Sequence, residues 1–134
     1  MTMQTNTKIR MALAQINTIV GDLDGNFQKI VQNINAAREA GCHLVAFPEL
    51  AIPGYPPEDL VLRGEFIRDQ KDILHKIADH VTNLVCVVGF VDDTDGNLYN
   101  SAAILQKGHI KAIYLTYHFG LTTLYIQRDQ MSFS

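Results

Sequence analysis

The sequence predicts an α/β fold with a mixed sheet, and three observations lead to this prediction. Apolar runs of strand length alternate with segments whose apolar residues recur at helical spacing. A helix joins the first two expected strands, which makes them parallel, whereas short turns join the last three, which makes them antiparallel. The composition, 47% hydrophobic and 19% charged over 134 residues, is that of a single globular domain. The expected element order is β-α-β-α-β-β-β.

The first expected unit is a strand, a helix and a second strand. Residues 9–16 are compact and mostly apolar, which predicts a strand covered on at least one face. Apolar residues at helical spacing follow over residues 27–37, and either Asp24 or Asn26 is suited to cap the start of this helix. Residues 44–47 then predict a short buried strand parallel to the first.

A loop and a second helix come next. Residues 51–57 contain three prolines and a glycine, which predicts a shaped loop. The segment Pro57–Asp59 combines a proline with two acids, as preferred at a helix N-terminus. Apolar residues recur at helical spacing between residues 66 and 81, and Gly64 is expected to weaken the early part of the helix.

Strands dominate the remaining expected elements. Residues 84–90 are rich in β-branched side chains, which predicts a strand. A polar cluster over residues 92–97 predicts the turn of a hairpin that returns through residues 98–106. Lys107 and Gly108 then turn the chain into a strand over residues 110–114.

Composition excludes several classes of function. The net charge is -3 and no run of Lys or Arg occurs, so the sequence lacks the clustered positive charge that binds nucleic acid or an anionic membrane. Its longest apolar run, residues 84–88, is far too short to span a bilayer. Residues 1–8 are polar and are expected to form a disordered leader. Cys42 and Cys86 alone make no disulfide framework, which favours the cytoplasm.

No metal site is expected. The runs Asp22–Gly25 and Asp93–Gly96 lack the ligand spacing and closing Glu of a calcium loop, so turns are predicted there. His75 and His80 are five positions apart, a spacing that does not bring two ligands to one helix face.

Glu49 is the clearest candidate for a catalytic residue. It follows a buried strand, and active sites of α/β proteins form at the carboxyl ends of parallel strands. Phe47 and Leu50 flank it, so partial desolvation is expected, which suits a general base. The alternative is a structural carboxylate that caps the next segment or forms a salt bridge. Position alone favours that alternative.

An ordered set of motifs resembles the carbon–nitrogen hydrolase (nitrilase) superfamily. The set comprises Met11–Asn17, Val20–Asp22, Phe47–Leu50 and Tyr99–Ala102. Within the superfamily, the segment Gly54–Leu60, followed by Leu62 and Arg63, is similar to the glutaminase domain of glutamine-dependent NAD synthetases. The resemblance covers residues 9–114 and implies the first half of an α-β-β-α layered sandwich.

The resemblance implies a chemistry with Glu49 as its general base. The implied site is a Glu–Lys–Cys triad, in which the cysteine attacks the side-chain amide of glutamine, the glutamate acts as base and the lysine stabilises the developing oxyanion. Ammonia leaves, and water then hydrolyses the thioester. The ammonia then serves a synthetase domain, which is the part that needs ATP and Mg, so no cofactor is implied for the glutaminase half. Tyr55 and the proline-rich loop after Glu49 are expected to line either the substrate pocket or the interface with a synthetase domain, and the alternative is a rigid surface loop. Tyr99 and Asn100 are expected to stabilise the hairpin rather than take part in the reaction.

The sequence departs from this family pattern after residue 114. Thr116 stands where the lysine belongs, and Lys111 is too early in the strand to replace it. Neither Cys42 nor Cys86 matches the segment of the nucleophile. Residues 115–134 therefore form a divergent tail, and we expect a truncated or frame-shifted reading of a longer gene that has no glutaminase activity by itself.

Three functional interpretations stay open at this point. The first is an incomplete glutamine amidohydrolase domain of an NAD synthetase. The second is another nitrilase branch, an aliphatic amidase or carbamoyl hydrolase, which the segment Gly54–Leu60 disfavours. The third is a non-catalytic protein, a decayed gene product or a binding module. Half of a layered sandwich exposes an apolar sheet face, so self-association is also expected.

Overall fold

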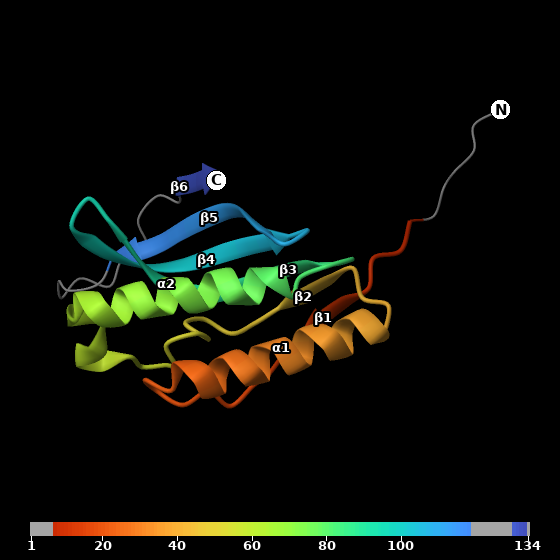
Figure 1. Cartoon of the computed structure of the whole chain (residues 1–134). Coiled ribbons are helices and arrows are strands. Elements are labelled where there is room, and N and C mark those ends of the chain that lie inside the picture. Colours follow the sequence, from red (N-terminus) through yellow and green to blue (C-terminus); the bar gives the residue numbers. More distant parts are fainter. Residues whose placement is uncertain (1–6, 119–129, 134) are drawn as a thin grey trace.

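A computed structural model describes residues 7–118 and 130–133 and shows a six-stranded sheet with two α-helices (Figure 1). The elements, in chain order, are β1 (Met11–Leu13), α1 (Leu23–Glu39), β2 (Leu44–Ala46), the 3-10 helix η1 (Glu58–Leu62), α2 (Gly64–Asp79), β3 (Val85–Thr94), β4 (Asn97–Gln106), β5 (His109–His118) and β6 (Gln130–Phe133). The sheet order follows the chain from β1 to β6. β1, β2 and β3 are parallel, and β3 to β6 are antiparallel, which confirms the mixed sheet.

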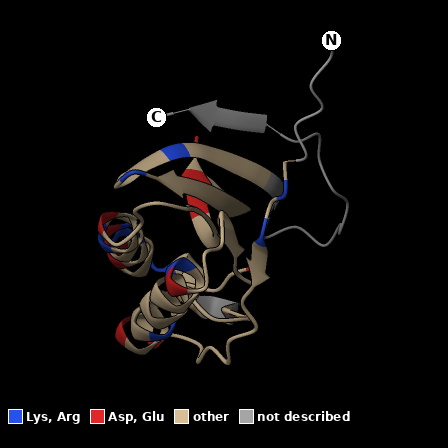
Figure 2. Ribbon diagram, turned by 90° about the vertical axis from the view of Figure 1, so that its right-hand side faces the viewer, with Lys and Arg blue, Asp and Glu red and all other residues tan. Residues whose placement is uncertain are grey.

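Both α-helices pack on the same face of the sheet (Figures 1 and 2). The core between them consists of apolar side chains at alternate strand positions and at helical spacing, because each element turns one face inward. Its fully buried members include Ile30 and Ile34 of α1, Ile77 of α2, and Val45, Cys86, Val88 and Phe90 of the strands. The βαβ unit and the second helix therefore form a single helix-covered layer, as predicted.

The opposite face of the sheet is apolar and largely uncovered by the described residues. The register aligns Leu13 with Ala46 and Val87, and these side chains point away from the helices. Leu13 is 75% exposed and Met11, two positions earlier, is 58% exposed. This is the open sheet face that half of a layered sandwich implies.

The first helix begins earlier than expected, and the predicted caps were wrong. Asp22 is the N-cap, and its side chain accepts a hydrogen bond from the Gly25 backbone N–H at 3.0 Å. Leu23 packs against the core, which adds a turn before the predicted start. Asp24 therefore lies in the first turn, and Asn26 is buried inside the helix with a different role.

The second helical segment is divided. Glu58–Leu62 forms η1, and Arg63 is extended (φ -93°, ψ 112°), so α2 starts only at Gly64. The predicted continuous helix from Pro57 was therefore wrong. Gly64 begins the helix rather than weakening its interior, and at this position its low helix propensity costs little.

The strand boundaries also differ from the predicted ones. β1 is restricted to Met11–Leu13, whereas residues 9–16 were expected to be extended. The hairpin turn after β3 contains only Asp95 and Gly96, both with positive φ (53° and 79°), as in the tight turns that match strand twist. β5 continues to His118, four residues beyond the predicted end.

The two predicted terminal segments are only partly described. Residues 115–118 of the expected tail belong to β5, and Gln130–Phe133 pairs with β5 as β6. The rest of the tail and residues 1–6 of the expected leader lie outside the described residues.

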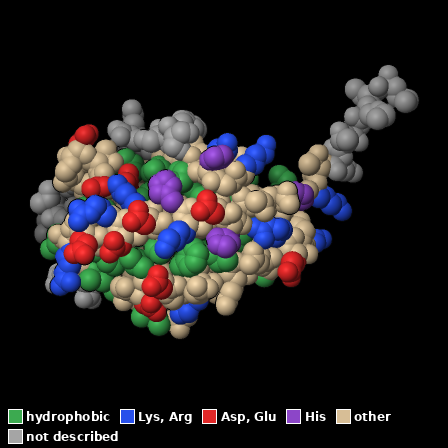
Figure 3. Space-filling view, viewed as in Figure 1, with side chains coloured by type: hydrophobic (Ala, Val, Ile, Leu, Met, Phe, Trp, Pro, Cys, Tyr) green, Lys and Arg blue, Asp and Glu red, His purple; other side chains and the backbone are tan. Residues whose placement is uncertain are grey.

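None of the helices in the described part of the chain is long and apolar enough to cross a membrane. Figure 3 shows acidic and basic side chains interspersed over the α2 side.

Candidate active site around Glu49

Glu49 lies on a loop that extends the sheet beyond the end of β2. The Phe47 N–H donates to the Val87 carbonyl oxygen at 2.9 Å, and the Ile52 N–H donates to the Gly89 carbonyl oxygen at 3.1 Å. Between these two bonds the backbone leaves the edge of β3 and returns to it. Glu49 is therefore held at the carboxyl end of a parallel strand, where the sequence placed it.

Gly89 of β3 allows this loop to approach the sheet closely. A Cβ atom at position 89 would lie 2.4 Å from the Leu50 nitrogen and 3.0 Å from the Pro48 carbonyl oxygen. Leu50, directly after Glu49, has a positive φ of 54° and is fully buried. Any side chain at position 89 would thus displace the backbone on both sides of Glu49.

Asn26 of α1 fixes the far end of the same loop. Its side-chain nitrogen donates to the carbonyl oxygens of Ile52 (2.9 Å) and Ile19 (2.8 Å), and its side-chain oxygen accepts from the Ile19 N–H (2.9 Å). The Asn26 side chain is fully buried. A backbone hydrogen bond from the Gly21 N–H to the Pro53 carbonyl oxygen (3.0 Å) also joins the segments that contain Ile19 and Ile52.

Asn100 of β4 contacts Glu49 directly. Its side-chain nitrogen donates a hydrogen bond to Oε1 of the Glu49 carboxylate, and Asn100 is only 3% exposed. Asn100 lies opposite Val91 of β3, whose N–H and carbonyl oxygen both bond the buried Gln70 side chain at 2.7 Å. The residue that holds Glu49 is therefore part of a rigid portion of the sheet.

The Asn100 contact is what sequence reasoning missed. Tyr99 and Asn100 were assigned only to stabilising the hairpin. One signal was available: a carboxamide in an expected strand must find a hydrogen-bond partner if it is buried. The sequence could not show that this partner is 51 residues earlier in the chain.

The predicted desolvation of Glu49 is not found. Glu49 and Pro48 are exposed in the described structure, whereas Phe47 is half-buried and Leu50 is buried. The apolar neighbours turn into the core and leave the carboxylate at the surface. The contact with Asn100 joins the Glu49 carboxylate to a neutral carboxamide of β4.

The position expected for the lysine lies next to Asn100. Asn100 pairs with Tyr117 and Ser101 pairs with Leu115, so Thr116 occupies the irregularity between these pairs. Lys111 lies five residues earlier in β5, roughly 16 Å away at the rise of a strand. The backbone thus brings position 116, and not Lys111, to the neighbourhood of Glu49.

The two cysteines are core residues. Cys86 is fully buried in β3, and burial raises the pKa of its thiol to about 12. Cys42 is 8% exposed, and both are free thiols. A nucleophilic cysteine needs a lowered pKa and access to substrate, and Cys86 has neither.

Tyr55 lies on the loop that begins at Glu49, and its side chain is 64% exposed. The adjacent Gly54 has a φ of 84° and packs so closely that a Cβ would lie 2.7 Å from the Val20 Cα. The base of the loop is therefore fixed while the Tyr55 ring faces outward. Its role in substrate binding stays a prediction.

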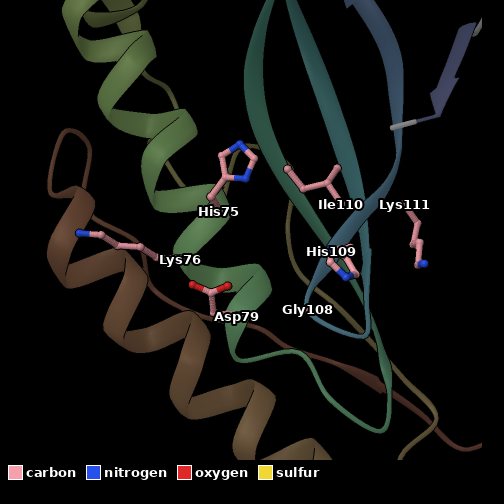
Figure 4. A pocket seen from close by; sticks show the side chains of 7 residues that line it. All are labelled: His75, Lys76, Asp79, Gly108, His109, Ile110 and Lys111. Carbon is pink, nitrogen blue, oxygen red and sulfur yellow. The ribbon is translucent and has the colours of Figure 1, made fainter.

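Two surface hollows lie away from Glu49. The first, about 470 Å³, lies between α2 and the β4–β5 turn and is lined by His75, Lys76, Asp79, Gly108, His109, Ile110 and Lys111 (Figure 4). Lys76 comes from the α2 side of this hollow and Lys111 from the β5 side, so the two lysines line it from different elements. The second, about 430 Å³, separates the start of α1 from α2. Among the described residues, no group of three or more His, Cys, Asp or Glu side chains is arranged to hold a metal.

Comparison with known proteins identifies relatives of this chain. A glutamine-dependent NAD(+) synthetase of Thermotoga maritima is 42% identical over 109 residues, which is 80% of this chain and 19% of that protein. The corresponding enzyme of Xanthomonas campestris is 42% identical over 107 residues, covering 79% of this chain and 19% of the relative. The chain thus spans about a fifth of the length of these relatives.

Solved structures show the same fold. A glutamine-dependent NAD(+) synthetase from Cytophaga hutchinsonii superimposes with a TM-score of 0.77 at 27% identity, over 80% of this chain and 18% of that one. An amidase from Nesterenkonia sp. superimposes with a TM-score of 0.69 at 23% identity, over 81% of this chain and 42% of that one. The sequence model of the family described as carbon–nitrogen hydrolase matches residues 10–131. The chain therefore belongs to the carbon–nitrogen hydrolase family.

Proposed function

We propose that this chain forms the part of a glutamine amidohydrolase site that supplies the general base, in a protein that makes ammonia for NAD synthesis. The observation that carries the proposal is the Glu49 carboxylate, which lies at the carboxyl end of β2 and is oriented by Asn100. In the proposed reaction Glu49 takes the proton of a cysteine thiol, and the thiolate attacks the glutamine amide.

The remaining groups of the proposed reaction must come from outside the described residues. Position 116 carries a hydroxyl side chain, which supplies no positive charge for an oxyanion. The buried Cys86 thiol cannot reach a substrate at the surface. We therefore expect the 134-residue chain to hydrolyse no glutamine by itself.

The relatives favour glutamine over other amides as the substrate of the proposed site. The NAD(+) synthetases that the chain resembles are glutamine-dependent and reach 42% identity. The similarity to the Nesterenkonia amidase, at 23% identity, supports the fold alone. The amidase or carbamoyl hydrolase interpretation therefore has no observation in its favour beyond the shared fold.

A chimeric enzyme tests the proposal. Residues 9–114 of this chain replace the matching segment of the Thermotoga maritima synthetase, so that the relative supplies everything after residue 114. We expect glutamine-dependent NAD formation that Glu49→Gln abolishes, while NAD formation from added ammonium persists in both proteins. A chimera that uses ammonium but not glutamine, or whose glutamine use survives Glu49→Gln, would contradict the proposal.

A direct assay tests the expectation for the chain alone. Ammonia release from glutamine by the 134-residue protein should equal the release in buffer. Robust release would overturn the assignment of the missing groups.

The proposed partners follow from the same site and from the open sheet face. They are glutamine, a synthetase domain that consumes the ammonia, and a second copy of the chain. Exposed Met11 and Leu13 support self-association, because a contiguous apolar face is unstable in water. Two free, buried thiols are consistent with a reducing compartment such as the cytoplasm.

A further inference from the structure

Asn100 is buried, polar and remote in sequence from its partner, and the proposed reaction does not by itself require it. Its carboxamide is 3% exposed, lies on β4 and donates to Oε1 of Glu49. A buried carboxamide without a partner is costly, so the orientation of the Asn100 side chain is determined by the bonds it makes. The contact therefore restricts the Glu49 side chain as much as it satisfies Asn100.

The backbone on both sides of this contact is fixed independently. Asn100 lies opposite Val91, which is held by the buried Gln70 side chain through two hydrogen bonds. Glu49 lies between the Phe47 and Ile52 bonds to β3, on a loop that packs against Gly89 without space for a Cβ. The backbone on either side of the contact therefore cannot shift without breaking these hydrogen bonds.

The register places Gly89 and Asn100 on the same face of neighbouring strands. Val91 is opposite Asn100 and Gly89 is opposite Ala102, so Gly89 and Asn100 are diagonal neighbours. The absent side chain at position 89 provides the space into which the loop of Glu49 fits. The carboxamide of Asn100 then meets the carboxylate at the border of that space.

We infer that Asn100 is a positioning residue for Glu49: it holds the carboxylate in the orientation from which it acts on the rest of the site. The inference rests on the proposed function only for the role of Glu49 as a base. The orientation itself is a property of the 134-residue chain. An exposed glutamate without such a bond samples several rotamers, and each misdirected rotamer removes the base from the reacting proton.

The side-chain amide signals of Asn100 in an NMR spectrum of the 134-residue chain report on this contact. In the parent chain we expect these signals to move with pH as one carboxyl group ionises, because ionisation strengthens the hydrogen bond. Glu49→Gln should remove that movement and leave the fold intact. Ser101→Ala is the matched control, because Ser101 is the adjacent buried polar residue and donates to Tyr99 instead. Its Asn100 signals should move as in the parent.

The chimera described above gives the catalytic readout. Asn100→Ala in the chimera should lower kcat for glutamine by roughly 10- to 100-fold with little change in KM, because the base is misdirected rather than the substrate lost. Ser101→Ala should keep the parent value. Ammonium-dependent NAD formation should be unchanged in both variants.

Two results would overturn the inference. One is an Asn100 signal that moves equally with pH in Glu49→Gln. The other is an active chimera whose kcat for glutamine is unaffected by Asn100→Ala. A chimera that is inactive with glutamine from the start would instead contradict the proposed function, and the NMR comparison would still decide whether Asn100 orients Glu49.

Discussion

Substitution of Asn26 by alanine tests how the loop that carries Glu49 is held. The Asn26 side chain is fully buried and makes three hydrogen bonds to the backbone of Ile19 and Ile52, at 2.8–2.9 Å. These bonds join two loops to one helix. Removal of the carboxamide therefore releases both the segment before α1 and the segment after Glu49.

The magnitude follows from these three bonds. The two bonds to Ile19 each contribute about 0.5–1.5 kcal/mol net, and the bond to the Ile52 carbonyl oxygen contributes about 1.5 kcal/mol, the upper end of that range. The fully buried Ile52 is the residue whose carbonyl oxygen loses its partner in the core. Alanine regains about 0.5 kcal/mol through its higher helix propensity. We expect Asn26→Ala to lower the free energy of unfolding by about 2–4 kcal/mol.

Asn33→Ala on the same helix is the matched control. Its side chain is half-buried and donates one bond, to the Lys29 carbonyl oxygen within the helix (2.8 Å). Loss of that bond is offset by helix propensity, so we expect a change within about 0.5 kcal/mol. The pair thus separates the effect of the three Asn26 hydrogen bonds from the general effect of removing an asparagine from α1.

Urea unfolding followed by far-UV circular dichroism measures both variants. With a slope of about 2 kcal/mol/M, Asn26→Ala should lower the midpoint by about 1–2 M, and Asn33→Ala should leave it nearly unchanged. If the two midpoints fall within about 0.3 M of each other at equal slopes, the Asn26 hydrogen bonds contribute little to stability, and the expected loss of about 2–4 kcal/mol is refuted.

Three further predictions concern the core, the Glu49 loop and the open face. The Cys86 thiol should react with a thiol reagent at neutral pH only after unfolding, since burial raises its pKa from 9.0 to about 12. The same shift means that the folded state binds this proton more tightly than the unfolded state. Its contribution to stability is complete below pH 9 and is lost as the pH rises toward 12, which urea midpoints across that range would show. Gly89→Ala should destabilise the chain by more than 2 kcal/mol in the same assay, about as much as overpacking costs, whereas Gly64→Ala, whose Cβ meets only an Arg68 nitrogen at 3.9 Å, should not. Leu13→Lys should reduce the average mass measured by light scattering at a given concentration, and an unchanged mass would argue against self-association through this face.

The general arrangement of the elements was predictable because it depends on local periodicity. The apolar spacing in α1, the β-branched residues of β3 and the polar turn before β4 each identify their element within about ten residues of sequence. The errors are local too. Asp22 caps α1 because Leu23 finds space in the core, and tertiary packing of that kind cannot be read from the positions of Asp24 and Asn26.

Of the candidate site, only Glu49 itself was identified from the sequence, and its catalytic role stays a prediction. Its position after a buried strand and its family motif are both contiguous in sequence. The residues that fix its geometry are not contiguous with it, because Asn26 is 26 positions from Ile52 and Asn100 is 51 positions from Glu49. Such contacts depend on the register between strands and on the path of a loop, and neither is encoded in a local pattern.

The location of these contacts determines what the described part of the chain can do on its own. Asn26, Gly89 and Asn100 come from α1, β3 and β4, and each one constrains Glu49 or its loop through contacts within residues 7–118. The contacts of the Glu49 carboxylate and its loop therefore come from a stretch that corresponds to about a fifth of the related synthetases. A lysine and a cysteine supplied from elsewhere, as the proposed function requires, would meet a carboxylate that Asn100 already contacts within the described residues. For this reason the effect of Asn100→Ala on Glu49 should be the same in the 134-residue chain and in the chimera, and a contact that forms only in the chimera would show that the missing groups help to position the base.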